Sequence, residues 1–417
     1  MSYVTHQRCS KCDALYPPEE VILTCERCGG RIEIIYDYER IAEDVTKEGL
    51  ERREPSVWRY RELLPIVNEE NIVSLGAGGT HLQRCHKLAE RLRVKGLYIK
   101  DETSNPSGSF KDRCATVSIS KALEGKAKAV TIASSGNAAA AAAAHAAKAG
   151  IPCYVFVSSA IDMSKLVQIR MYGAKVMCVE GIVHDCTKMT IEASKRYGWV
   201  NVTTSSTFNP YTVQGPKTTA YEVSQQLGWE TPAWMIIPVG SADNLSGHWL
   251  GFRDFREMGF IDEIPRLVGI QAAGCAPFVE AYREGKRPEE IEPWENIQTI
   301  ASGLADAYPY DVEVAMSGVR ESGGCAESVT DEEMLEALKL LGSDEGIFAE
   351  PSGAASVAGL RRLLDDGVID HGDVVVCEVT GTGLKDPKSM AGIHGEPVRI
   401  RPSMEELDRV LREGLVF

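Results

Sequence analysis

An alternation of short apolar runs with helix-like stretches constrains the fold of this chain most, and it extends from about residue 72 onward. Continuous apolar runs are typical of strands buried on both faces, and helices between such strands favour parallel sheets. The expected strands are residues 96–100, 129–133, 152–157, 175–179, 234–238, 267–271 and 373–378. We therefore expect an α/β fold in which the loops after the strands face the ligand.

The length and composition indicate an enzyme-sized soluble protein with more than one core. The chain has 417 residues, 44% hydrophobic and 25% charged, whereas a single domain usually has about 100 to 200 residues. Its formal net charge of -15 argues against a nucleic acid or an anionic membrane as a partner. The sequence shows neither a signal peptide nor a run of about 20 apolar residues. We expect a cytoplasmic protein.

Four of the twelve cysteines form two CxxC pairs near the N-terminus, Cys9 with Cys12 and Cys25 with Cys28. This is the spacing of a zinc ribbon, in which two tight turns direct four thiolates at one ion. A site closed by four sulfurs has no free position for chemistry, so the prediction is a structural zinc. The alternative is two surface turns with free thiols.

Three loops rich in Gly, Ser and Asn stand where a predicted strand gives way to a helix: residues 107–111, 134–137 and 238–247. Such loops expose backbone N–H groups at a helix N-terminus, which is a ready site for an anion. None of them has the GxGxxG spacing of a dinucleotide fold or the GxxxxGK[ST] spacing of a P-loop. Each alone could be an ordinary turn.

Lys111 stands at the end of the first loop and adds a reactive amine to the three loops. We expect an amine near a helix N-terminus and away from water to have a lowered pKa, which carbonyl capture requires. Pyridoxal phosphate would use all three loops, with the lysine for its aldehyde, one loop for its phosphate and one for its ring edge. The alternative is a solvated lysine at a helix start.

These motifs, Ser107-Gly-Ser-Phe-Lys-Asp-Arg113 above all, resemble the fold-type II pyridoxal-phosphate enzymes, and most closely the threonine synthase family. The resemblance covers essentially the whole chain. It implies that Lys111 forms the Schiff base with the cofactor and is the catalytic base. The cofactor-binding residues it implies are Lys111, Asn137, Gly240, Ser241, Ala242, Asp243, Asn244 and Thr380. Thr380 would face the pyridine nitrogen, which favours elimination and replacement over transamination.

The same resemblance implies a domain plan and a substrate-binding set. A zinc ribbon would occupy residues 1–36, the large cofactor-binding domain 37–112 and 206–400, the small domain 113–205, and a C-terminal helix 401–417. Both larger domains would be three-layer parallel-sheet units, and the protein would be a homodimer. The expected substrate-binding residues are Ser134, Ser135, Gly136, Ala138 and Thr212.

Two of these residues depart from the pattern of the family. Ala138 stands where a Thr is usual, and Thr212 where an Arg would hold the substrate phosphate, so several substrates stay possible. The best single prediction is conversion of O-phospho-L-homoserine and water to L-threonine and phosphate. The alternatives are cysteate synthase-like β-replacement on O-phosphoserine, serine or threonine dehydration, and a non-catalytic cofactor-binding protein.

The residues that could replace the missing donors to a substrate phosphate are Arg113, Lys165, Arg170, Lys217 and His248. A further departure is Asp243, where the family has a glycine in the loop for the cofactor phosphate. Its charge would be unfavourable there unless the side chain turns away.

Overall fold

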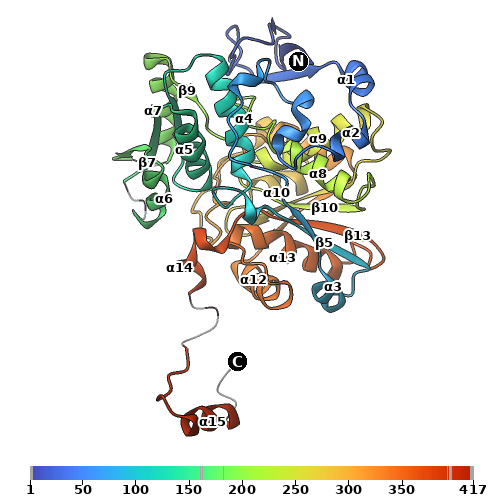
Figure 1. Cartoon of the computed structure of the whole chain (residues 1–417), viewed down its shortest axis with the longest axis vertical. Helices are drawn as coiled ribbons and strands as arrows, with labels where there is room; N and C mark the ends of the chain where they lie inside the picture. Colours follow the sequence, from blue (N-terminus) through green and yellow to red (C-terminus); the bar gives the residue numbers. More distant parts are fainter. Residues whose placement is uncertain are drawn as a thin grey trace.

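The computed structural model describes residues 3–159, 161, 163–181, 183–391, 393 and 397–413, apart from the side chains of residues 164, 165 and 183. The strands in this part of the chain form three sheets. Figure 1 shows the N-terminal sheet at one end, the largest sheet in the centre, and a smaller sheet with its helices to one side.

The N-terminal sheet is antiparallel and has the order β2-β1-β3. Its strands are β1 (Val4–Cys9), β2 (Leu15–Tyr16) and β3 (Ile32–Tyr36). Its small core contains Cys9 and Cys25 together with Ala14, Ile22 and Ile32. The chain then passes through α1 (Tyr38–Asp44), α2 (Lys47–Glu51), η1 (Val57–Leu63) and η2 (Glu69–Asn71).

The largest sheet has the order β12-β11-β10-β13-β5-β4, with all neighbours parallel except the pair β4 and β5. The strands are β4 (His81–Arg84), β5 (Gly96–Asp101), β10 (Trp234–Pro238), β11 (Arg266–Ala272), β12 (Cys325–Val329) and β13 (Val374–Val379). Side chains alternate along β10, so Met235 and Ile237 enter one core while Trp234 and Ile236 enter another. The sheet is therefore covered on both faces.

The helices around the largest sheet divide between these two cores. One core contains residues of α8 (Lys217–Gln226), α9 (Asp243–Glu257), α10 (Pro277–Arg283) and α11 (Val312–Glu321). The other contains residues of α3 (His86–Leu92), α12 (Asp331–Glu345) and α13 (Pro351–Asp365). The short helices here are η3 (Glu102–Ser104), η5 (Pro288–Glu290), η6 (Gly383–Lys385) and α14 (Pro387–Met390).

The smaller sheet is parallel and has the order β8-β7-β6-β9. Its strands are β6 (Val130–Ala133), β7 (Cys153–Ser158), β8 (Lys175–Val179) and β9 (Val200–Asn201). Helices α4 (Lys111–Glu124), α5 (Asn137–Ala149) and α6 (Val167–Met171) contribute to the core on one face, next to η4 (Met163–Leu166). Helix α7 (Val183–Tyr197) packs on the other face. The run of alanines in α5 is buried, which allows close packing against α4.

The prediction of an α/β fold with strands in seven apolar runs is confirmed, each strand lying within one or two residues of its predicted bounds. The sequence did not indicate β4, β9 or β12, and each of these lies at an edge of its sheet. Edge strands face solvent or are short, so they lack the continuous apolar run that identifies a central strand.

The last described helix, α15 (Met404–Arg412), lies apart from the sheets in Figure 1. Within the described residues, no helix combines the length and the apolar character that a membrane span requires.

Candidate active site

Lys111 is the first residue of α4 and lies between elements of the two larger sheets. The loop before it turns at Gly108, where φ is 89° and a Cβ atom would lie only 2.8 Å from Thr382 Cγ2. Both facts favour glycine at this position. Lys111 Nζ donates to Asp243 Oδ2 at 2.7 Å and to Thr204 Oγ1 at 3.0 Å. The lysine is therefore held at the point where α9 begins.

The pKa of Lys111 contradicts the expectation from the sequence. Burial is the largest influence and lowers the pKa of this amine, but the charge and hydrogen bond of Asp243, together with the charges of Cys114 and Asp306, outweigh burial, and the net pKa is raised. The predicted lowered pKa is therefore wrong for this arrangement, because the sequence could not show which carboxylate contacts the lysine. Asp243 does turn its carboxylate to Lys111 and Ser241 Oγ, the latter at 2.9 Å.

The loop between β10 and α9 contains the residues predicted to bind the cofactor phosphate. Ala242 caps α9 with φ at 70°, and Gly240 approaches Asp306 so closely that a Cβ atom would lie 2.8 Å from Asp306 Oδ2. Burial raises the pKa of Asp306 to about 6. The first backbone N–H groups of a helix have no partner within the helix, so the start of α9 can accept an anion. Asn244 donates from Nδ2 to Glu378 Oε2 at 2.8 Å.

The second loop and the end of β13 meet beside Lys111. Asn137 begins α5, and its Nδ2 donates to Glu350 Oε1 at 2.7 Å. A Cβ atom on Gly381 would lie 2.5 Å from Glu350 Oε1 and 3.3 Å from Asn137 Nδ2. The backbone N–H of Phe110 donates to the carbonyl oxygen of Thr380 at 2.9 Å. The structure thus brings all three predicted loops and the Thr380 segment together.

These residues fit pyridoxal phosphate. An amine on Lys111 can capture an aldehyde, the start of α9 can accept a phosphate, and the amide of Asn137 can donate to a ring oxygen. Asp243 does not oppose this fit, because its carboxylate is paired with the lysine.

The predicted substrate-binding residues divide into two groups. Ser134, Ser135 and Gly136 precede α5, and a Cβ atom on Gly136 would meet nothing within 4 Å. Ala138 is buried within the helix. Thr212 is also buried, and its hydroxyl donates to the carbonyl oxygen of Asn209 at 2.8 Å.

Three of the five alternative phosphate donors are committed to buried partners. Arg113 pairs with Glu102 and Glu222, each at 2.7 Å, and Lys217 pairs with Asp254 at 2.7 Å. His248 Nδ1 lies 2.9 Å from the carbonyl oxygen of Asn244, and burial lowers the pKa of the imidazole to about 4. All three side chains are buried, which argues against contact with a substrate. Arg170 is exposed on α6, and the side chain of Lys165 lies outside the described residues.

The four N-terminal cysteines converge as predicted. The Sγ atoms of Cys9, Cys12, Cys25 and Cys28 all lie within 4.8 Å of one another. Gly30 leaves room for them, since a Cβ atom there would lie 2.9 Å from Cys9 Sγ.

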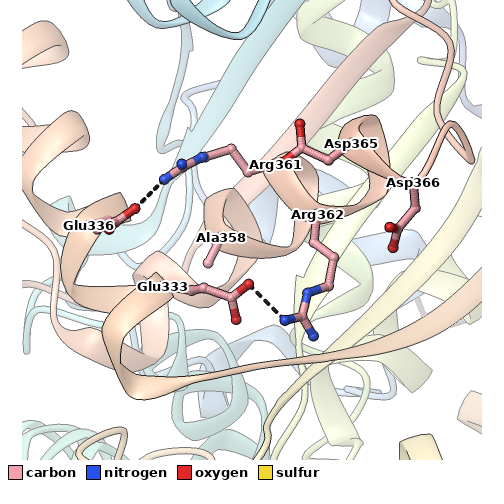
Figure 2. A pocket seen from close by; sticks show the side chains of 7 residues that line it. All are labelled: Glu333, Glu336, Ala358, Arg361, Arg362, Asp365 and Asp366. Atoms are coloured by element: carbon pink, nitrogen blue, oxygen red, sulfur yellow. Dashed lines mark hydrogen bonds and ion pairs between the residues drawn. The ribbon is translucent and has the colours of Figure 1, made fainter.

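A shallow pocket lies elsewhere, between α12 and α13 (Figure 2). Arg361 pairs with Glu336 at 2.6 Å and Arg362 with Glu333 at 2.8 Å. Arg361 and Arg362 lie beyond the middle of α13, about 15 Å from the helix start that follows Glu350. The pocket is a surface of paired charges, separate from Lys111.

Sequence reasoning assigned no role to Thr204, Glu350 or Asp306. Thr204 lies in a run of small polar residues just after β9, which is the one signal that pointed to it. Glu350 stands directly before α13 in a stretch that resembles the family, but its contact with Asn137 joins residues 213 positions apart.

Residues 73–381 match a family model described as pyridoxal-phosphate dependent enzyme. A threonine synthase of Methanocaldococcus jannaschii is 45% identical over 408 residues, covering 98% of this chain and 99% of that protein. A threonine synthase of Methanosarcina acetivorans is 42% identical, with 96% and 97% of the two chains covered. The processed threonine deaminase isoform 2 of Solanum lycopersicum has a similar fold, with a TM-score of 0.64 and 21% identity over 76% of this chain and 87% of that one. The chain therefore belongs to the pyridoxal-phosphate-dependent enzymes, within the threonine synthase family.

Proposed function

We propose that this protein is a threonine synthase that converts O-phospho-L-homoserine and water to L-threonine and phosphate, with pyridoxal phosphate as its cofactor. The observation that carries the proposal is 45% identity to a threonine synthase over 98% of the chain. The convergence of Lys111, Asn137 and the start of α9 supports it.

The cofactor, when bound, supplies an electron sink that stabilises negative charge beside the substrate amino group. Lys111 and Asn137 would hold its aldehyde and ring edge, residues Gly240 to Asn244 its phosphate, and Thr380 its pyridine nitrogen. Lys111 Nζ would also take and return the protons of substrate carbons. Thr204 and Asp243 fix the position of this nitrogen, at 3.0 and 2.7 Å.

The substrate carboxylate would bind at the start of α5, where Ser134, Ser135 and Gly136 precede the helix. Backbone N–H groups at a helix N-terminus stabilise an anion, and the space beside Gly136 leaves room for one.

A substrate panel tests the proposal against β-replacement and dehydration. Holoenzyme is incubated with phosphohomoserine, O-phosphoserine with nucleophiles, serine or threonine, and phosphate, threonine and keto acid are measured together. We expect equal amounts of phosphate and threonine from phosphohomoserine. Keto acid from serine without any threonine from phosphohomoserine would replace the proposal by the dehydratase alternative.

We also propose that Cys9, Cys12, Cys25 and Cys28 hold a structural zinc. Four sulfurs around zinc at about 2.3 Å lie slightly under 4 Å apart, which the convergence within 4.8 Å supports. Metal analysis should find about one zinc per chain, and Cys12→Ser should lower that content without removing pyridoxal phosphate. Full cofactor loading with no bound metal in the wild type would contradict the zinc site.

Localisation, assembly and domain division complete the proposal. We expect a cytoplasmic homodimer with an N-terminal ribbon, a large domain of residues 37–112 and 206–400, and a small domain of residues 113–205. The grouping of strands into three sheets supports this division. Light scattering on purified protein measures the mass of the assembly.

A further inference from the structure

A substrate with a phosphate leaving group needs a cation, and the residues first considered do not supply one. Arg113, Lys217 and His248 have buried partners. The hydroxyl of Thr212 donates to the carbonyl oxygen of Asn209. A cation near the loop that ends at Lys111 could supply this charge instead.

Lys385 is such a cation. It ends η6, which follows Thr380 and Gly381 after β13. The backbone N–H of Thr382 donates to the carbonyl oxygen of Gly108 at 3.0 Å, and a Cβ atom on Gly108 would lie 3.3 Å from Lys385 Cε. The lysine side chain thus lies against the turn that positions Lys111.

The amino group of Lys385 is held by a neutral partner. Its Nζ donates to Gln168 Oε1 at 2.7 Å, and Gln168 Nε2 donates to the carbonyl oxygen of Ser107 at 3.0 Å. The second bond fixes the orientation of the amide, so its oxygen faces the lysine. An ammonium group has three N–H donors. Only one of them has an acceptor among the described residues, so two N–H groups are left without a described acceptor.

The charge of Lys385 is incompletely balanced. Within the described residues, no carboxylate comes within the 4.0 Å of an ion pair with its Nζ. Asp112 Oδ2 instead accepts from the N–H and the hydroxyl of Ser107, both at 2.8 Å, and Glu350 Oε1 accepts from Asn137. Burial lowers the pKa of Lys385, although the charges of Glu350 and Asp112 oppose that shift. A half-buried cation in this state is stabilised by an added anion.

We propose that Lys385, oriented by Gln168, binds the side-chain phosphate of the substrate and so takes the place of the arginine that Thr212 replaces. The inference rests on the proposed function, since it concerns the phosphate of phosphohomoserine. It assigns a specificity-determining role to a residue for which the sequence suggested none.

The experiment compares wild-type holoenzyme with Lys385→Met, Lys385→Arg and Lys388→Met. Lys388 is exposed three residues further along the chain, and its variant makes the same charge change. KM and kcat for phosphohomoserine, competitive inhibition by inorganic phosphate, and the visible absorption of bound cofactor are measured. We expect Lys385→Met to raise KM and the inhibition constant of phosphate about 10- to 100-fold, the usual effect of a charged hydrogen bond. Lys385→Arg should stay within a few-fold of the wild type, and Lys388→Met should be unchanged.

Unchanged KM and phosphate inhibition in a cofactor-loaded Lys385→Met variant would overturn the inference. If that variant does not load cofactor, Gln168→Leu decides in the same assays: a few-fold rise in both constants supports the site, and no change overturns it. Failure of the proposed function is seen separately, as absence of threonine formation by the wild type. In that case calorimetric titration of the holoenzymes with inorganic phosphate decides, since equal binding by wild type and Lys385→Met rejects the site.

Discussion

Lys111 and Arg113 lie two residues apart at the start of α4 and are both ion-paired, yet their surroundings differ sharply. Arg113 is fully buried and bonds Glu102 and Glu222 through Nε, Nη1 and Nη2 at 2.7 to 2.8 Å. Lys100 also donates to Glu222 at 2.7 Å. Two cations therefore balance two anions. Lys111 has one carboxylate partner, Asp243, and one hydroxyl partner, Thr204.

The difference separates a structural charge from a reactive one. An arginine stays charged at any pH that a protein tolerates, so it does not transfer a proton. The N–H groups of Arg113 that bond the two glutamates are also not available to a ligand. Burial opposes the charges of Arg113 and Glu222, but their attraction prevails, raising the pKa of the arginine and lowering that of the glutamate. A lysine with two partners can leave them for a cofactor aldehyde.

Lys111→Ala tests the reactive role of the lysine and should have the largest effect on activity. We expect at least about a 10³-fold loss of threonine formation, since the change removes both the attachment point of the cofactor and a general base. The midpoint of urea unfolding, measured without added cofactor, should also fall, because Asp243 loses its cation, but by less than in Arg113→Met, since the Lys111 side chain is partly exposed and water can reach the vacated position. Cofactor that stays covalently bound to the variant, as seen in its mass spectrum, would refute the role of Lys111.

Arg113→Met should break the structural side. It leaves Glu102 and Glu222 buried with only Lys100 as a cation, which costs about 3–5 kcal/mol of unfolding free energy. Urea denaturation followed by circular dichroism measures this change. The matched control is Arg361→Met, whose pair with Glu336 is exposed and should contribute less than about 1 kcal/mol. Equal small losses in both variants would contradict the distinction drawn here.

Asp243→Asn should sharpen the comparison by making Lys111 easier to deprotonate. The raised pKa means that the ion pair stabilises the cofactor-free protein below the ordinary lysine value of about 10.4 and is lost as pH rises through the folded-state pKa. Without the carboxylate, burial remains and lowers the pKa. The pH midpoint for the rate of cofactor attachment should therefore fall. Asp306→Asn should give a smaller fall in this midpoint. An unchanged midpoint in Asp243→Asn would exclude the ion pair with Asp243 as the cause of the raised pKa of Lys111.

Thr204→Ala should have the smallest effect of the four. It removes one hydrogen bond to Lys111, worth about 1 kcal/mol, so cofactor affinity should fall roughly fivefold. Absorption titration of the cofactor-free protein measures this affinity. Thr204→Ser keeps the hydroxyl and should retain the wild-type value; a loss as large as that of Thr204→Ala would point to packing of the methyl group instead.

The residue pattern predicted the central strands, the fold class and the family. It also predicted that the three loops adjoin one site, and the structure brings Lys111, Asn137 and the start of α9 together. It did not predict the edge strands β4, β9 and β12, because exposed or short strands lack the apolar run that identifies buried ones.

The partners of the site residues could not be predicted in the same way. Lys111 meets Thr204 and Asp243 across 93 and 132 positions, and Lys385 meets Gln168 across 217. The sign of the pKa shift of Lys111 depends on its ion pair with Asp243, whose atoms lie 2.7 Å apart. A local pattern contains no such distance, so the expected lowered pKa was wrong.

The sequence by itself determined the central strands and the helices between them, because burial and turn formation depend on residue type and spacing over a few positions. It also determined the chemistry available, through one lysine behind a glycine turn and four cysteines in two pairs. Only the tertiary structure decided which charges are closed off and which remain available. Arg113 is enclosed by acids from two other segments, whereas the partner of Lys385 among the described residues is the amide of Gln168, and such pairing depends on distances between remote parts of the chain.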